Sequence, residues 1–132
     1  MKTGVHVIKD KDDLEFAVKL THDEHWFYTH LEIGRMLELD PDGSFVFEDR
    51  GKRLGFITTV SYSGTGVIGH LIVAHDARRR KIGETLLKEA VAYLEGRGVE
   101  TIMLYASGEG QKLYSRHGFS VRQQALVLHT RL

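Results

Sequence analysis

The apolar and polar positions at the start of the chain predict one strand followed by one helix. Weak alternation over Gly4–Lys9 is typical of a strand. Asp10 is placed to cap a helix that runs to about His22. One face of this helix carries Leu14, Ala17 and Val18.

A second helix is predicted by its capping signals. Thr29 and Glu32 form a T-x-x-E capping box, and Tyr28 and Ile33 stand where a hydrophobic staple would. The apolar residues of this helix are Leu31, Met36, Leu37 and Leu39. We expect it to end before Asp40-Pro41-Asp42-Gly43, which has the signature of a type I turn.

The middle of the chain predicts three strands and one long helix. The strands cover Ser44–Asp49, Arg53–Tyr62 and Val67–Ala74, with a turn at Ser63-Gly64-Thr65-Gly66. The helix runs from Ile82 to about Glu95 and is closed by Gly96 and Gly98. Its single apolar stripe consists of Ile82, Leu86, Leu87, Ala90, Val91 and Leu94.

The last part of the chain predicts a buried strand, a short helix and a closing β segment. These cover Thr101–Ala106, Glu109–His117 and Phe119–Leu132, and the last is one or two strands. Ser107 is the expected N-cap of the short helix, and Gly118 follows its end. The order β-α-α-β-β-β-α-β-α-β describes an α/β (α+β) chain with a mixed sheet flanked by helices.

Composition favours one globular domain over residues 1–132, with 42% apolar and 27% charged residues. Eighteen Lys and Arg balance eighteen Asp and Glu, which argues against a nucleic-acid partner. No apolar run approaches the ~20 residues of a membrane span, and no signal-peptide layout begins the chain. Because the chain has no cysteine, we expect a cytoplasmic protein without disulfides or thiolate metal sites. A homodimer is the commonest assembly in general.

The most informative segment joins an apolar strand end to the long helix. Four consecutive cations, Arg78 to Lys81, precede Gly83 at the start of that helix. Free N–H groups at a helix N-terminus, together with clustered cations, favour an anion such as phosphate or pyrophosphate. A solvated charged turn and a nuclear-localisation signal are the alternatives.

The eight histidines give no recognisable metal site. His22 and His25 stand three residues apart and could present two ligands, but no third ligand follows at a recognisable spacing. His70 is expected inside a strand as a half-buried polar residue, and His75 in the turn that follows it.

Two motifs together resemble those of the GCN5-related N-acetyltransferase (GNAT) family. Leu71-Ile72-Val73 matches the strand end before its acetyl-CoA motif, and Arg78 and Gly83 match the first and last positions of Arg/Gln-x-x-Gly-x-Gly/Ala. Lys81 departs from that motif, because the family usually has its first glycine there. Leu113-Tyr114 followed by Gly118-Phe119 is similar to the common Leu-Tyr-x-x-x-Gly-Phe. The chain particularly resembles the N-terminal acetyltransferase-like domain of prokaryotic two-domain members.

The resemblance implies the acyl-CoA N-acyltransferase fold, with a mainly antiparallel sheet. It implies transfer of an acetyl group from acetyl-CoA to a primary amine of a small molecule or peptide by direct attack, without a metal. Tyr114 matches the usual general acid, which would protonate the leaving CoA thiolate. The implied cofactor-binding residues are Leu71, Ile72, Val73, Arg78, Arg79, Arg80, Lys81, Ile82, Gly83, Glu84, Thr85, Ser107 and Tyr114.

The general base is not evident from the sequence. Relatives often place a Glu or His at positions matching Val67 or Gly69, which are apolar here. His70 is one residue away and would face the opposite side of the sheet unless a bulge intervenes. Other candidates are His25, His30, Glu32 and Tyr105, and a water that relays the proton or a substrate amine with a low pKa would also serve.

The aromatic cluster His25-Trp26-Phe27-Tyr28 could line an amine pocket or pack in the core. The alternative to an enzyme is an acetyl-CoA-binding regulatory module with the same fold and little catalysis. The substitution at Lys81 and the absence of a base at the usual strand positions favour that alternative.

Overall fold

The computed structural model describes residues 3–23, 29–78, 80–105, 113–116, 118, 120–123 and 126–130. Its strands form one seven-stranded sheet in the order β1-β2-β3-β4-β5-β7-β6. They are β1 (Thr3–Val7), β2 (Phe45–Asp49), β3 (Lys52–Tyr62), β4 (Thr65–Val73), β5 (Thr101–Tyr105), β6 (Ser120–Gln123) and β7 (Leu126–Thr130). Among these described strands, only β4 and β5 pair in parallel, so the prediction of a mixed, mainly antiparallel sheet is confirmed.

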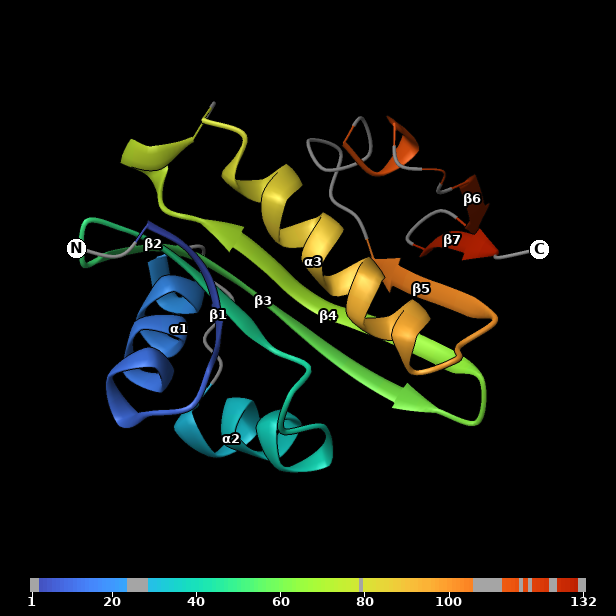
Figure 1. The fold of residues 1–132 in the computed structure, drawn as a ribbon, viewed down its shortest axis with the longest axis horizontal. Helices are drawn as coiled ribbons and strands as arrows, with labels where there is room; N and C mark the ends of the chain where they lie inside the picture. The colour runs from blue at the N-terminus through green and yellow to red at the C-terminus, as the bar shows by residue number, and fades with distance from the viewer. Residues whose placement is uncertain are drawn as a thin grey trace.

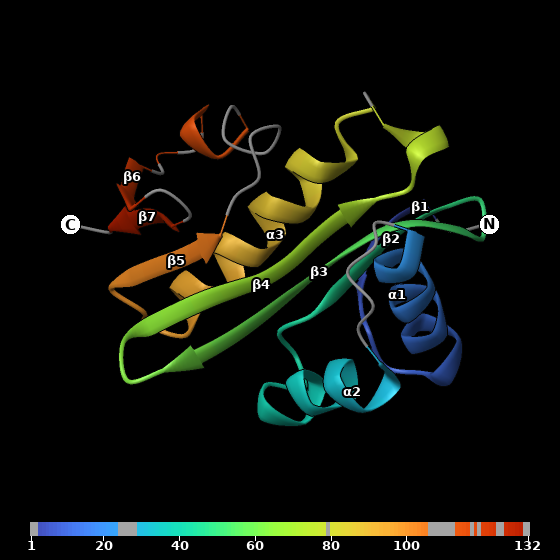
Figure 2. The same ribbon diagram turned by 180° about the vertical axis from the view of Figure 1, so that it is seen from behind.

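Helices cover both faces of the sheet (Figures 1 and 2). Helix α3 (Ile82–Gly96) packs its apolar stripe on one face, where Leu86, Leu87 and Leu94 are fully buried. Helices α1 (Lys11–Asp23) and α2 (His30–Leu39) cover the other face, and their core centres on Phe56 and Ile72. Within the described part of the chain, every helix is too short or too polar to cross a bilayer.

The predicted capping groups close the ends of the helices. Asp10 Oδ1 accepts from the Asp13 amide at 2.8 Å, as expected of the cap of α1. Thr29 and Glu32 form the predicted capping box of α2. The turn after α2 closes with a bond from the Gly43 amide to the Asp40 carbonyl at 3.0 Å. Local sequence signals were therefore sufficient at these positions.

The β3–β4 hairpin differs in detail from the predicted elements. The β3–β4 turn contains only Ser63 and Gly64, both at positive φ (41° and 87°), so β4 begins at Thr65. Positive φ at both central residues is the geometry of a tight type I′ hairpin, which keeps the twist of the flanking strands. The closing segment, predicted as one or two strands, forms two short strands, β6 and β7.

Part of the predicted short helix lies outside the described residues. One helical turn is present at residues 113–116, whereas the predicted N-cap Ser107 lies in the segment that is not described. Tyr28, the predicted first member of the hydrophobic staple, also lies outside. His75 is exposed in a short 3₁₀ helix (His75–Ala77), close to the expected turn.

Candidate cofactor and acceptor site

The site is organised by an open edge on β4. Strand β5 pairs with β4 only from Thr65 to Ile68 and then continues in its pairing with β7. Residues 70–73 of β4 pair with β3 on one side and have no strand partner among the described residues on the other. Figure 2 shows β4 running on beyond the end of β5. This half of β4 can pair its backbone with an extended ligand.

The register determines which backbone groups face the open edge. The Ala74 amide donates to the Leu54 carbonyl of β3, at 2.8 Å. Because N–H groups alternate in direction along an antiparallel strand, the Ile72 amide also points toward β3. The amides of Leu71 and Val73 therefore point into the open edge. Of the three strand residues predicted to bind the cofactor, Leu71 and Val73 present their N–H groups to the open edge.

The N-terminus of α3 lies close to this edge. A Cβ added to Gly83 would contact Leu113 Cδ2 and Val73 Cγ2, each at 3.7 Å. Gly83 therefore lies between the end of β4 and the helical turn at residues 113–116. The structure thus brings together the two motifs that the sequence places thirty residues apart.

Helix α3 begins without a side-chain cap, unlike α2. Its N-cap, Lys81, lies in the left-handed region (φ 61°, ψ 20°) and makes no capping bond with its side chain. The first amide with an intrahelical bond is that of Thr85, which donates to the Lys81 carbonyl at 3.0 Å. The amides of Ile82, Gly83 and Glu84 are those that a helix leaves without intrahelical acceptors. Glycine, the residue that the resemblance implies at position 81, adopts this left-handed backbone most readily.

Two cations of the basic run, Arg78 and Arg80, bind other parts of the chain. Arg78 Nε donates to the carbonyl of Val73 at 3.1 Å, and Arg80 binds Asp49 at 2.7 Å. The bond from Arg80 is the main reason that the pKa of Asp49 is lowered. These two cations hold the loop to β4 and to the end of β2, while Lys81 is exposed and Arg79 lies outside the described residues.

Two further predicted cofactor residues bind within their own helix. Glu84 pairs with Lys88 at 3.3 Å, and Thr85 Oγ1 donates to the Lys81 carbonyl at 2.9 Å. Both the amide and the hydroxyl of Thr85 therefore bind the Lys81 carbonyl, so of these two residues only Glu84 has an amide without an intrahelical acceptor at the helix terminus.

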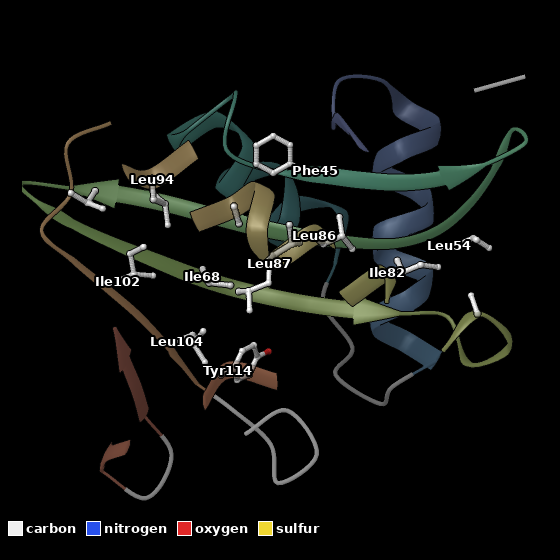
Figure 3. Close-up of a cluster of buried hydrophobic side chains, with 14 residues drawn as sticks. Phe45, Leu54, Ile68, Ile82, Leu86, Leu87, Leu94, Ile102, Leu104 and Tyr114 are labelled. Atoms are coloured by element: carbon white, nitrogen blue, oxygen red, sulfur yellow. The ribbon is translucent and has the colours of Figure 1, made fainter. Parts of the chain in front are cut away.

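Tyr114 is buried beside the core on the α3 face of the sheet. Its side chain is 7% exposed, and Figure 3 shows it next to Leu104. Burial raises the pKa of Tyr114 to about 12. Desolvation therefore makes the Tyr114 phenol of the free protein a weaker acid than an exposed tyrosine.

The opposite face of β4 carries His70, and a bulge puts it there. Thr58 pairs with His70 while Thr59 pairs with Ile68, so Gly69 is an extra residue in β4. Such an extra residue shifts which face of the sheet the side chains after it point to. Ile68 packs on the α3 side, whereas His70 lies against Thr58 and Phe56 on the side of α1 and α2. The bulge that the sequence analysis required for His70 is present.

A side chain at Gly69, the usual base position, would require the side chains of Met36 and Thr58 to move. A Cβ there would lie 2.6 Å from Met36 Cε and 2.9 Å from Thr58 Oγ1. His70 is 4% exposed, and its Nδ1 is 2.8 Å from Thr58 Oγ1. Burial lowers the pKa of His70 to about 4, against a smaller opposing effect of Glu32. Thr58, which contacts His70, and Met36, which lies over Gly69, belong to no motif, and the sequence did not indicate either of them.

The other candidate bases are less well placed or not described. Glu32 is exposed and bound into the capping box of α2. The side chains of His30 and Tyr105, and all of His25 to Tyr28, lie outside the described part of the structure. Within the described part, no group of three acidic or histidine side chains could hold a metal ion.

Comparison with known proteins agrees with this geometry. The family described as "Acetyltransferase (GNAT) domain" matches residues 40–121, more than half of the chain. The chain is 37% identical over 90 residues to a mycothiol acetyltransferase from Stackebrandtia nassauensis, covering 61% of this chain and 29% of that protein. It is 29% identical over 133 residues to an uncharacterized N-acetyltransferase from Methanocaldococcus jannaschii, covering 86% of this chain and 59% of that protein.

A solved structure supports the fold. PaiA N-acetyltransferase from Thermoplasma acidophilum, solved in complex with coenzyme A, superposes with a TM-score of 0.84 at 17% identity, covering 98% of this chain and 99% of that one. The splayed β4–β5 pair and the adjacent helix terminus define an acyl-CoA-binding type of fold. The chain belongs to the GNAT acetyltransferase family. It spans less than two thirds of either curated relative.

Proposed function

We propose that this chain is an acetyltransferase domain that transfers the acetyl group of acetyl-CoA to a primary amine by direct attack. The observation that carries the proposal is the open edge of β4 beside the uncapped N-terminus of α3. GNAT acetyltransferases use acetyl-CoA as their acetyl donor. The proposed acceptor is an amine of a small molecule or peptide.

Backbone groups supply most of the cofactor contacts in this proposal. The amides of Ile82, Gly83 and Glu84, with the helix dipole, bind the pyrophosphate. The pantetheine arm pairs with β4, and the Leu71 amide donates to the thioester carbonyl oxygen. That bond strengthens as negative charge grows on the oxygen in the tetrahedral intermediate. Arg79 and Ser107 remain predicted cofactor contacts.

Tyr114 is the proposed general acid toward the CoA thiolate. A phenol with a pKa of about 12 is a weaker acid than a thiol near 8.5, so the transfer is uphill by roughly 5 kcal/mol. A turnover of ~10 per second corresponds to a total barrier of about 16 kcal/mol. The cost is therefore compatible with ordinary turnover.

Calorimetry and CoA release together test the proposal. We expect acetyl-CoA to bind with a micromolar Kd, and S-acetylpantetheine, which lacks the diphosphate, to bind at least ~100-fold more weakly. Free CoA should then be released in the presence of amines. Acetyl-CoA binding without turnover on any amine would favour the regulatory module, and no binding at millimolar acetyl-CoA would reject both readings.

Replacing Tyr114 by phenylalanine should lower kcat by about 10- to 100-fold, because the thiolate loses its proton donor. The Kd of acetyl-CoA should change little, since the ring still fills its place against Leu104. Stopped-assay measurement of CoA release from pH 6 to 10 checks this. An unchanged kcat across that range would remove Tyr114 from the mechanism.

The cytoplasmic location and the homodimer expected from the sequence stay predictions of this proposal. Cell fractionation and light scattering of the purified chain would examine them.

A further inference from the structure

The turn between β2 and β3 holds the loop that connects β4 to α3. Arg80 of the loop binds Asp49 at the end of β2, with 2.7 Å between Nη2 and Oδ2. Lys52, at the start of β3, lies 3.4 Å from Asp76 in the same loop. The Asp49 side chain is only 24% exposed, whereas the two side chains of the second pair are 70% and 72% exposed. The loop is therefore anchored more firmly at Arg80 than at Asp76.

The carboxylate of Asp49 is itself fixed by its surroundings. Thr3 Oγ1 donates to Asp49 Oδ1 at 2.9 Å and accepts from the Arg50 amide at 3.3 Å. Arg50 and Gly51 both have positive φ (53° and 81°), the geometry of a tight hairpin turn. The bonds from Arg80 and Thr3 hold the pKa of Asp49 below its ordinary value, so the carboxylate is ionised at neutral pH. Arg80 therefore binds an acceptor that is already in place.

The residue after Arg80 has a backbone conformation that lysine rarely adopts. Lys81, the N-cap of α3, lies at φ 61° and ψ 20°. For a residue other than glycine, the left-handed conformation is disfavoured by roughly 5- to 30-fold in population. Such a backbone persists only where the surrounding structure fixes it. The two neighbours of Lys81 do so, because Ile82 is 2% exposed in the core and Arg80 is bound to Asp49.

The conformation of Lys81 decides where α3 begins, and therefore which amides form its terminus. The first intrahelical acceptor is the Lys81 carbonyl, which accepts from the Thr85 amide at 3.0 Å. If Lys81 were helical, Arg80 would be the N-cap and the helix would begin one residue earlier. One residue moves the terminal amides by about 1.5 Å along the helix axis and by about 100° around it. A diphosphate placed between this terminus and the open edge of β4 would lose that geometry.

We propose that Asp49 is a positioning residue for the cofactor: through Arg80 it holds Lys81 in the left-handed conformation and thereby fixes the first residue of α3. This inference rests on the proposed binding of acetyl-CoA. The ion pair takes the place of the glycine that the family resemblance implies at position 81, because glycine adopts this backbone without an anchor. A partly exposed ion pair adds little to the stability of the whole fold, but it is strong enough to shift a local equilibrium by about 5-fold.

The charge of Asp49 and its positioning role predict opposite effects on binding. Removing a carboxylate near an anion site makes the site more positive, which by itself strengthens the binding of a diphosphate. Loss of the anchor weakens binding, because the apparent affinity falls with the fraction of chains in which Lys81 is left-handed. Asp76→Asn removes a carboxylate from the neighbouring, more exposed ion pair, and so reports the effect of charge alone.

Calorimetry with acetyl-CoA tests the inference. We expect Asp49→Asn to raise the Kd about 5-fold, and Asp76→Asn to stay within ~2-fold of the wild-type value. The kcat of Asp49→Asn at saturating acetyl-CoA should be unchanged, since the bound chain has the correct helix terminus. In a Lys81→Gly background, Asp49→Asn should change the Kd by less than ~2-fold, because glycine needs no anchor. NMR of the free Asp49→Asn chain should show the Lys81 backbone torsions moving toward the right-handed helical region.

Each result supports or overturns the inference. An unchanged or lowered Kd in Asp49→Asn, an equal loss in Asp76→Asn, or an undiminished loss in the Lys81→Gly background would overturn it. Left-handed torsions that persist at Lys81 in folded Asp49→Asn would do the same. Failure of the wild-type chain to bind acetyl-CoA would instead reject the proposed function, whereas the NMR measurement needs no cofactor and still decides whether Asp49 fixes the start of α3. Thermal unfolding of each variant separates a local change from loss of the fold.

Discussion

Replacing Gly83 by glutamate should weaken acetyl-CoA binding at least ~100-fold, about 2.7 kcal/mol, while leaving the fold intact. A Cβ at residue 83 points between Val73 and Leu113, both at 3.7 Å, which is ordinary contact distance. The rest of a glutamate side chain would extend from this contact toward the open edge of β4. It would also place a negative charge next to the amides that bind the diphosphate in our proposal. Calorimetry with acetyl-CoA measures the loss directly.

The fold should tolerate this change, because an acidic residue in the first turn of a helix interacts favourably with the helix dipole. Gly83→Ala adds only a Cβ, and so separates its effect from that of the charge and length of the glutamate side chain. We expect this variant to lose less than ~10-fold in affinity for acetyl-CoA. Lys81→Gly is a second control: it relaxes a left-handed residue and should stay within ~1 kcal/mol of wild-type stability. Wild-type affinity in Gly83→Glu would place the cofactor elsewhere.

The elements were predictable where the signal is local. The capping box at Thr29 and Glu32, the cap at Asp10 and the stripe of α3 each depend on residues within a few positions of one another. The order of the strands in the sheet and the open edge of β4 depend on pairing between distant segments. They entered the sequence analysis only through the resemblance to the family.

The site was predictable in outline and not in detail. The sequence identifies Gly83 and Tyr114 as motif positions, and the structure places the helical turn that carries Tyr114 beside Gly83. The sequence does not indicate that Arg80 binds Asp49, because a contact across 31 positions leaves no local pattern. The bulge at Gly69 is also invisible in the pattern, since a one-residue slip depends on how β3 and β4 pair.

The end of α1 next to the sheet is fixed by one buried carboxylate. Asp13 is fully buried, and its Oδ1 accepts from Arg53 Nε at 2.7 Å. His6 Nε2 lies 3.2 Å from both carboxylate oxygens, and the Lys9 amide donates at 3.3 Å. Burial alone would raise the pKa of Asp13, but the bonds from Arg53, His6 and the Lys9 amide outweigh it and leave the pKa lowered. Asp13 therefore joins α1, β1 and β3 as an ionised group.

Asp13→Asn should destabilise the chain by about 3 kcal/mol at pH 7, because it removes the charge that compensates Arg53. Since the folded pKa of Asp13 lies below its ordinary value, its ionisation stabilises the fold above about pH 4 and ceases to do so as the pH falls through the lowered pKa. The difference between wild-type and variant urea midpoints should therefore shrink on going from pH 7 to pH 3. The neighbouring exposed Asp12→Asn provides the matched control and should change stability by less than ~0.5 kcal/mol at either pH. Equal midpoints for the two variants at pH 7 would mean that the buried ion pair contributes nothing beyond a surface charge.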